Sequence, residues 1–133
     1  MRARTGLVTP APGGPHVEQV GWGVARQVVR VLREQGVDDP SGVLDRLPDV
    51  AERAGHLAYA VFEGRTAIAA SLVVLPADGD EAATYVGEAV VPTAEDGVRE
   101  ALLVRALHDV ANAGVAWLEV PSPAVDLRPL GFS

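Results

Sequence analysis

The strongest constraint on the fold is a series of β-type runs in the second half of the chain. Two short apolar runs, residues 57–62 and 66–75, are separated by a joint that contains Gly64. Runs of this length and composition predict β-strands, and a glycine at the joint fits a hairpin turn that needs a positive φ. Residues 84–91 form a third run of the same kind. We therefore expect a core built around a β-meander.

The third strand is followed by a helical pattern and then by one more strand. Between residues 97 and 113, apolar side chains recur at helical spacing, at Val98, Leu102, Leu103, Ala106, Leu107 and Val110. Gly114 stands where a left-handed C-terminal cap is expected. The nearly all-apolar run 115–120 is typical of a central strand that is buried on both faces. A strand–helix–strand crossover after a meander implies a mixed sheet with helices on both faces.

The first half of the chain predicts one strand and two helices. Residues 4–9 are expected to form a short strand, and the Pro- and Gly-rich stretch 10–15 excludes regular structure. From His16 to about Gly36, valines recur at steps of three and four, which predicts an amphipathic helix with a stripe of Val17, Val20, Val24, Val28 and Val31. This helix would be stabilised mainly by burial, because valine is a poor helix former.

A second, shorter helix is predicted after a capping signal at Asp39. We expect Pro48 to interrupt it. The predicted element order is β–α–α–β–β–β–α–β, an α/β (mixed α+β) fold in a single domain covering residues 1–133. This order alone is compatible with several α/β and α+β folds.

Composition excludes several classes of function. The chain has no cysteine and its eleven basic residues are all arginines, so thiolate metal sites, a cysteine nucleophile and a Schiff-base lysine are excluded. A net charge of −7 argues against nucleic-acid binding. The longest apolar run, 67–75, is too short to span a bilayer, and the N-terminus has no apolar run of signal-peptide length. We expect a soluble, cytoplasmic protein with no membrane partner.

Local motifs narrow the choice of fold. The run from Tyr59 into the second strand, the strand end Val91-Pro92 with its loop and helix, and the closing Leu130-Gly131-Phe132 stand in a fixed order. Together they resemble the GCN5-related N-acetyltransferase (GNAT) superfamily over about residues 57–132. The resemblance implies a central mixed sheet with helices on both faces. It also implies an acyl-CoA-dependent N-acyltransferase that uses acetyl-CoA and an amine acceptor.

In that family the loop before the long helix carries the pattern Arg/Gln-x-x-Gly-x-Gly/Ala, whose glycines let backbone amides approach the CoA pyrophosphate. Here Gly97 matches the first glycine, whereas Ala94 replaces the leading Arg/Gln and Arg99 replaces the second small residue. Glu95 and Asp96 add two carboxylates to the same loop. Those carboxylates either repel a pyrophosphate or serve as ordinary first-turn residues of the helix.

The resemblance implies the following cofactor-binding residues: Val90 and Val91 beside the pantetheine, Gly97, Val98 and Arg99 at the pyrophosphate, and Arg128 near the end of the chain. It also implies a base on the strand before the loop, where Glu88 lies three residues before Val91. A base of this kind works if burial lifts its pKa toward the working pH. Glu88 is equally compatible with a surface residue or with a carboxylate paired to an arginine.

The family often has a tyrosine as general acid just before the closing Leu-Gly-Phe, and here that position is Arg128. An arginine does not release its proton near neutral pH, but it can bind a carboxylate or a phosphate. The remaining phenols are Tyr85 and Tyr59, of which Tyr59 is expected to pack in the hairpin. The three histidines lack metal-ligand spacing, so no metal site is predicted.

Two functions remain open at this stage. The first is acetyl transfer to an amine, with Glu88 as the base. The second is a GNAT-fold module that has lost catalysis and serves binding or regulation. The chain ends at Ser133, where the family usually adds one or two strands, so we expect an open sheet edge. Such an edge favours strand addition from a partner or a homodimer.

Overall fold

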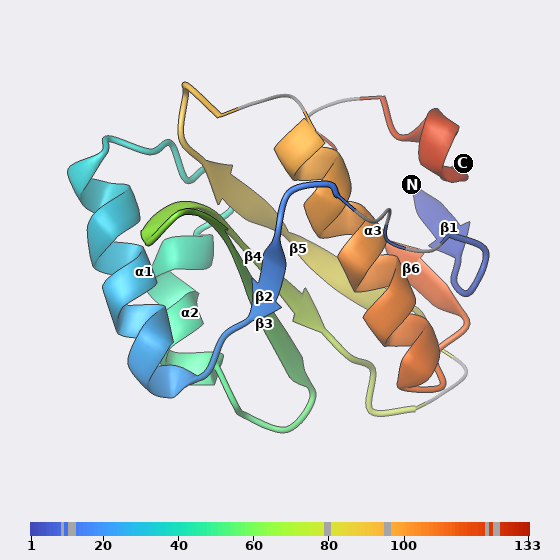
Figure 1. The fold of residues 1–133 in the computed structure, drawn as a ribbon. Coiled ribbons are helices and arrows are strands. Elements are labelled where there is room, and N and C mark those ends of the chain that lie inside the picture. Colours follow the sequence, from blue (N-terminus) through green and yellow to red (C-terminus); the bar gives the residue numbers. More distant parts are fainter. Residues whose placement is uncertain (9, 11–12, 79–80, 95–96, 122, 124–125) are drawn as a thin grey trace.

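The computed structural model describes residues 1–8, 10, 13–78, 81–94, 97–121, 123 and 126–133. Within them one six-stranded sheet crosses the molecule, in the order β1-β6-β5-β4-β3-β2 (Figure 1). The strands are β1 Arg2–Arg4, β2 Val17–Gln19, β3 His56–Glu63, β4 Thr66–Val74, β5 Ala83–Val90 and β6 Trp117–Glu119. Neighbouring strands pair antiparallel except β5 and β6, which are parallel. The sheet is therefore mixed, as predicted.

Helices cover both faces of this sheet (Figure 1). They are α1 Trp22–Glu34 and α2 Val43–Val50 on one face and α3 Gly97–Asn112 on the other, with a short 3-10 helix, η1 Arg128–Leu130, near the end of the chain. Alternation along β3 separates two cores: Ala58 and Ala60 pack toward α1 and α2, whereas Tyr59 and Val61 pack toward α3. The predicted mixed α/β architecture is confirmed.

Several local predictions are confirmed in detail. Gly64 turns the hairpin between β3 and β4 with a φ of +62°, and Gly114 ends the segment after α3 with a φ of +83°. The Asp39 carboxylate accepts the backbone N–H groups of Val43 at 2.8 Å and Leu44 at 2.9 Å, so it caps α2. The predicted interruption at Pro48 is wrong, because α2 continues through that residue to Val50.

The prediction of a helix starting at His16 is also wrong. Residues 17–19 form β2, which pairs antiparallel with β3, and α1 begins only at Trp22. Val17 lies opposite Val61 and is buried there, because a strand edge supplies hydrogen-bond partners that an isolated helical turn lacks. The buried face of α1 consists of Ala25, Val28, Val29 and Leu32, while Val24 is 44% exposed.

The N-terminal segment occupies the sheet edge that the sequence predicted to be open. β1, which lies earlier than the predicted strand at 4–9, pairs with the outer side of β6, from Arg2 opposite Glu119 to Arg4 opposite Trp117. On its other side, Arg2 exchanges two backbone hydrogen bonds of 3.0 Å with Ser133. The two ends of the described chain lie side by side (Figure 1). A homodimer therefore stays a prediction and lacks the support of an open edge at β6.

No helix in the described ranges is both long enough and apolar enough to cross a bilayer. A cytoplasmic location stays a prediction from composition.

Candidate active site

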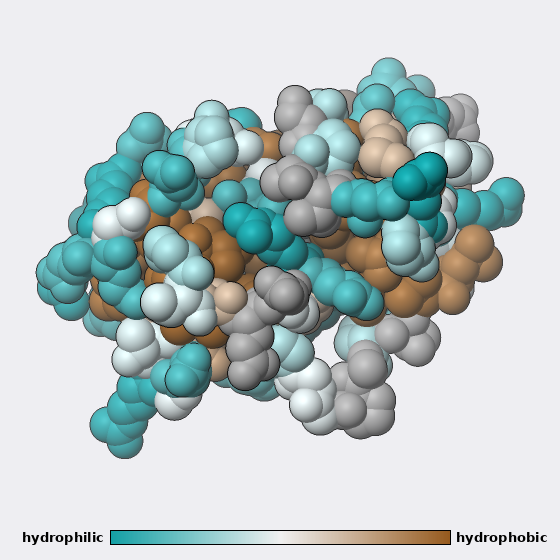
Figure 2. Space-filling model, turned by 90° about the horizontal axis from the view of Figure 1, so that it is seen from above, coloured by the Kyte–Doolittle hydropathy of each residue, from teal (hydrophilic) through white to brown (hydrophobic). Residues whose placement is uncertain are grey.

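The two parallel strands in the middle of the sheet separate soon after they meet. β5 and β6 pair only at Ala83 with Leu118 and at Thr84 with Glu119. Beyond Thr84 a cavity of about 230 Å³ opens between β5, the start of α3 and the chain that follows β6. Seen from above, apolar residues lie in hollows between hydrophilic side chains (Figure 2). The divergence of the strands is what makes room for the cavity.

A β-bulge in β5 determines which side chains face this cavity. Leu72 of β4 pairs with Gly87, but the next residue, Val73, pairs with Tyr85, so Val86 is an extra residue in β5. An extra residue reverses the alternation of side chains along a strand. Tyr85 before the bulge and Glu88 after it therefore share the α3 face of the sheet, although they are three residues apart.

Gly87 allows another element to approach the bulge closely. A Cβ atom at Gly87 would overlap with the side chain of Ser41, which precedes α2 and lines the cavity. This close contact explains why the position holds a glycine.

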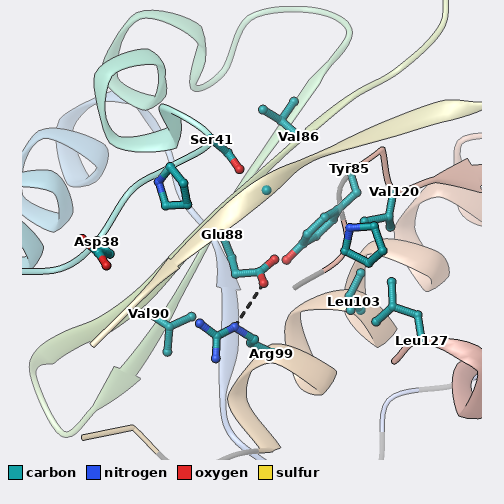
Figure 3. A pocket seen from close by; sticks show the side chains of 13 residues that line it. Asp38, Ser41, Tyr85, Val86, Glu88, Val90, Arg99, Leu103, Val120 and Leu127 are labelled. Carbon is teal, nitrogen blue, oxygen red and sulfur yellow. Dashed lines mark hydrogen bonds and ion pairs between the residues drawn. The ribbon is translucent and has the colours of Figure 1, made fainter. Parts of the chain in front are cut away.

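Glu88 forms an ion pair with Arg99 from the first turns of α3. The Arg99 Nε donates to the Glu88 Oε1 at 3.2 Å (Figure 3). The Glu88 side chain is 13% exposed and the Arg99 side chain is 43% exposed. The carboxylate is thus held at the cavity wall by a guanidinium that is itself half open to solvent.

Two buried hydroxyls lie next to Glu88. Tyr85 is 1% exposed, and Ser71, directly opposite Glu88 on β4, is fully buried. Neither hydroxyl makes a well-formed hydrogen bond with a described residue. The Tyr85 hydroxyl points toward the Glu88 carboxylate (Figure 3). Burial raises the pKa of Tyr85 well above its ordinary value, and the charge of Glu88 raises it further. Tyr85 therefore keeps its proton at neutral pH.

Comparison with known proteins identifies the architecture. A predicted acetyltransferase from Clostridium acetobutylicum, solved with acetyl-CoA, superposes with a TM-score of 0.66 at 9% identity, covering 89% of each chain. A GCN5-related N-acetyltransferase from Kribbella flavida gives 0.68 at 14% identity, covering 99% of this chain and 52% of that one. The chain has the GNAT fold. A transcriptional regulator from Bacillus halodurans shares it, at 0.66 and 17% identity over 90% of this chain and 93% of that one. By sequence, no protein-family model and no curated protein matches.

Within the GNAT fold, the cavity brings together only some of the residues predicted from the sequence. Glu88, Val90 and Arg99 line it. Val91 lies on the opposite face of the sheet, and its N–H donates to the carbonyl of Ile68 at 2.9 Å. Val98 is buried in the core between α3 and the sheet.

The other predicted cofactor residues lie outside this cavity. Gly97 begins α3 and lines a separate cavity of about 320 Å³ beneath the N-terminal segment. Arg128 is exposed and donates to both carboxylate oxygens of Asp126 at 2.9 Å, which lowers the pKa of that carboxyl. The predicted loop residues Glu95 and Asp96 lie outside the described residues. The roles assigned to Gly97 and Arg128 stay predictions.

Sequence reasoning gave no role to Ser71 and left Tyr85 as an unassigned phenol. The signal that would have connected Tyr85 with Glu88 is the glycine between them, because Gly87 in a strand interior indicates a bulge. Ser71 was hidden because nothing local reveals which residue lies opposite it. No three His, Cys, Asp or Glu side chains lie close enough to hold a metal ion in the ranges that the structure describes.

Proposed function

We propose that the protein is an acyl-CoA-dependent N-acyltransferase that transfers an acetyl group to an amine. The observation that carries this proposal is the cavity between the diverging strands, with a carboxylate on the bulged strand at its wall. A site of this kind supplies the two things that acyl transfer needs: a slot for the acyl donor and a base for the attacking amine.

The residues around the cavity fit the thioester end of acetyl-CoA. Leu103, Val120 and Leu127 give it an apolar wall, next to Val90 of β5. A volume of about 230 Å³ suits the acyl group and the adjoining thioester, so most of the ligand would lie outside. The unpartnered Tyr85 hydroxyl gives the cavity a donor for a ligand oxygen or sulfur. Bound acetyl-CoA would supply an activated acetyl group with a thiol leaving group.

The start of α3 supports binding of the pyrophosphate. The first backbone N–H groups of a helix have no partner within the helix and attract anions. α3 begins at Gly97, and Arg99 stands in its first turn with a half-exposed guanidinium. In this proposal Arg99 has two roles: it holds the Glu88 carboxylate and it offers positive charge to a phosphate group.

Glu88 is the base in the proposed reaction. Its carboxylate is mostly buried, lines the cavity and is oriented by Arg99. A carboxylate in this position takes a proton from the attacking ammonium or amine, directly or through one water molecule.

Calorimetry with acetyl-CoA tests the binding part of the proposal. We expect saturable binding to the wild-type protein and roughly tenfold weaker binding to Arg99→Gln, because a charged contact to phosphate is lost. The matched control is Arg65→Gln, which removes the same charge from the exposed turn between β3 and β4 and should bind like wild type. Absence of heat and of thermal stabilisation at millimolar acetyl-CoA would overturn the proposed function.

Glu88→Gln tests the chemical part. This variant should bind acetyl-CoA within a factor of a few of wild type, and its rate of thiol release with primary amines should fall about 10²–10⁴-fold. An unchanged rate would remove Glu88 from the mechanism and leave the binding proposal intact.

One observation favours a second candidate, a GNAT-fold binding or regulatory module. Glu88 is already engaged by Arg99, and the similar structure from Bacillus halodurans is described as a transcriptional regulator. The module predicts acetyl-CoA binding without turnover, or no binding at all. The titration and the thiol-release assay together distinguish the two candidates.

A further inference from the structure

Tyr85 places a protonated hydroxyl inside the cavity with no structural partner. The residue is 1% exposed, lines the cavity and makes no well-formed hydrogen bond among the described residues. A buried hydroxyl without a partner destabilises a fold, and a phenylalanine of the same shape would avoid that cost. Folding therefore gives no reason for this hydroxyl, which points to a ligand that it serves.

The surroundings of the hydroxyl suit proton transfer. The Glu88 carboxylate faces it, and Ser71 lies opposite Glu88 on β4 (Figure 3). Arg99 is the described cation at this wall, and it is engaged with Glu88 through its Nε. A proton acceptor and a proton donor thus stand side by side on one cavity wall, brought together by the bulge at Val86.

We propose that Tyr85 is the proton donor of the acyl transfer and that Glu88 returns the proton to it; this inference rests on the proposed function. The amine nitrogen forms a bond to the thioester carbon, and the carbon–sulfur bond breaks. Glu88 takes the proton that the amine loses, and Tyr85 gives its phenolic proton to the departing sulfur. The proton on Glu88 then moves to the Tyr85 oxygen, so both groups are restored and the products are an amide and a free thiol.

The alternatives for this role are less well placed. Arg128 keeps its proton near neutral pH and is bound to Asp126. Tyr59, the second of the two tyrosines in the chain, donates its hydroxyl to Asp109 at 2.8 Å and does not line this cavity. Tyr85 is the tyrosine that faces Glu88 across the cavity wall.

Phenylalanine variants at the two tyrosines test the proposal as a matched pair. With acetyl-CoA and a panel of primary amines, Tyr85→Phe should lower kcat about 10²–10³-fold and leave the KM for acetyl-CoA nearly unchanged, because a group acting in the transition state is removed. Tyr59→Phe should keep the wild-type kcat. The melting temperature shows whether each variant folds, and Tyr85→Phe should melt no lower than wild type.

A second measurement does not depend on turnover. With 3-fluorotyrosine at both positions, the fluorine NMR spectrum should show two tyrosine signals, which the two phenylalanine variants assign. Acetyl-CoA should shift the Tyr85 signal clearly, and the Tyr59 signal little.

The outcomes separate this inference from the proposed function. If calorimetry shows that acetyl-CoA binds but the Tyr85 signal does not move, or if Tyr85→Phe keeps the wild-type kcat, the role of Tyr85 is refuted and the proposed function stands. If acetyl-CoA does not bind to the wild-type protein, the proposed function fails and this inference fails with it.

Discussion

The two tyrosines occupy polar clusters of opposite character on the same face of the sheet. In the Tyr59 cluster, the hydroxyl donates to Asp109, and Arg105 donates to the same carboxylate at 2.9 Å and to the carbonyl of Val17 at 2.7 Å. The Arg105 guanidinium also lies over the Tyr59 ring. This cluster ties α3 to β3 and β2.

The Tyr85 cluster, made of Tyr85, Ser71, Glu88 and Arg99, contains a single ion pair and two buried hydroxyls without well-formed hydrogen bonds. It also opens on a cavity, with Arg99 half exposed. Buried polar groups that satisfy one another stabilise a fold, whereas partly satisfied groups cost stability and are retained where a ligand uses them. The comparison assigns a structural role to the Tyr59 cluster and a functional role to the Tyr85 cluster.

The largest expected effect on stability comes from breaking the Tyr59 cluster at its centre. Asp109→Ala removes the acceptor of two side chains and leaves Arg105 without its carboxylate, which should lower the free energy of unfolding by about 2–3 kcal/mol. Urea denaturation measures this change. Asp45→Ala is the matched control, because the Arg33–Asp45 pair is exposed and its loss should cost less than about 1 kcal/mol. Equal losses in both variants would refute a special role for the cluster.

High pH tests the burial that the two tyrosines share. Burial is the main cause that raises the pKa of both tyrosines above the ordinary value of 10.0. Above about pH 10 the unfolded chain ionises its tyrosines while the folded chain does not, so the unfolded state binds fewer protons and stability falls as pH rises. Each tyrosine should contribute about 1.4 kcal/mol of loss by pH 11. Urea denaturation between pH 9 and 11 measures the slope.

The phenylalanine variants assign that slope to each tyrosine. Tyr59→Phe and Tyr85→Phe should each remove about half of the loss. A slope that neither variant changes would show that the tyrosines do not govern stability at high pH.

At neutral pH the same variants should diverge. Tyr59→Phe removes a hydrogen bond to a carboxylate and should lower the free energy of unfolding by about 1–2 kcal/mol. Tyr85→Phe removes a hydroxyl without a partner and should change it by less than about 0.5 kcal/mol, or increase it. Denaturation at pH 7 provides the comparison. A larger loss for Tyr85→Phe than for Tyr59→Phe would reverse the assignment of the two clusters.

Ser71→Ala gives the smallest expected effect on stability. Its buried hydroxyl has no well-formed hydrogen bond, so its removal should leave the free energy of unfolding within about 0.5 kcal/mol of wild type. A loss of more than about 1 kcal/mol, measured by urea denaturation, would show that Ser71 is bonded in solution and that the Tyr85 cluster is structurally satisfied.

Much of the fold followed from local signals in the sequence. The hairpin turn at Gly64, the cap at Asp39 and the C-terminal glycine at Gly114 depend on residues close together in the chain, and each is confirmed. The helix that was predicted from His16 was wrong because a tertiary contact decided it. The valines there fit a helix or a strand, and pairing with β3 selected the strand for residues 17–19.

The sequence by itself determined the order of the central strands and of α3, because hydrophobic period and turn glycines act over a few residues. It also pointed to Glu88 and Arg99. Only the tertiary structure decided that these two residues pair, that β1 fills the edge of β6, and that the extra residue Val86 turns Tyr85 toward Glu88. The physical reason is that strand register and edge pairing depend on contacts between segments far apart in the chain.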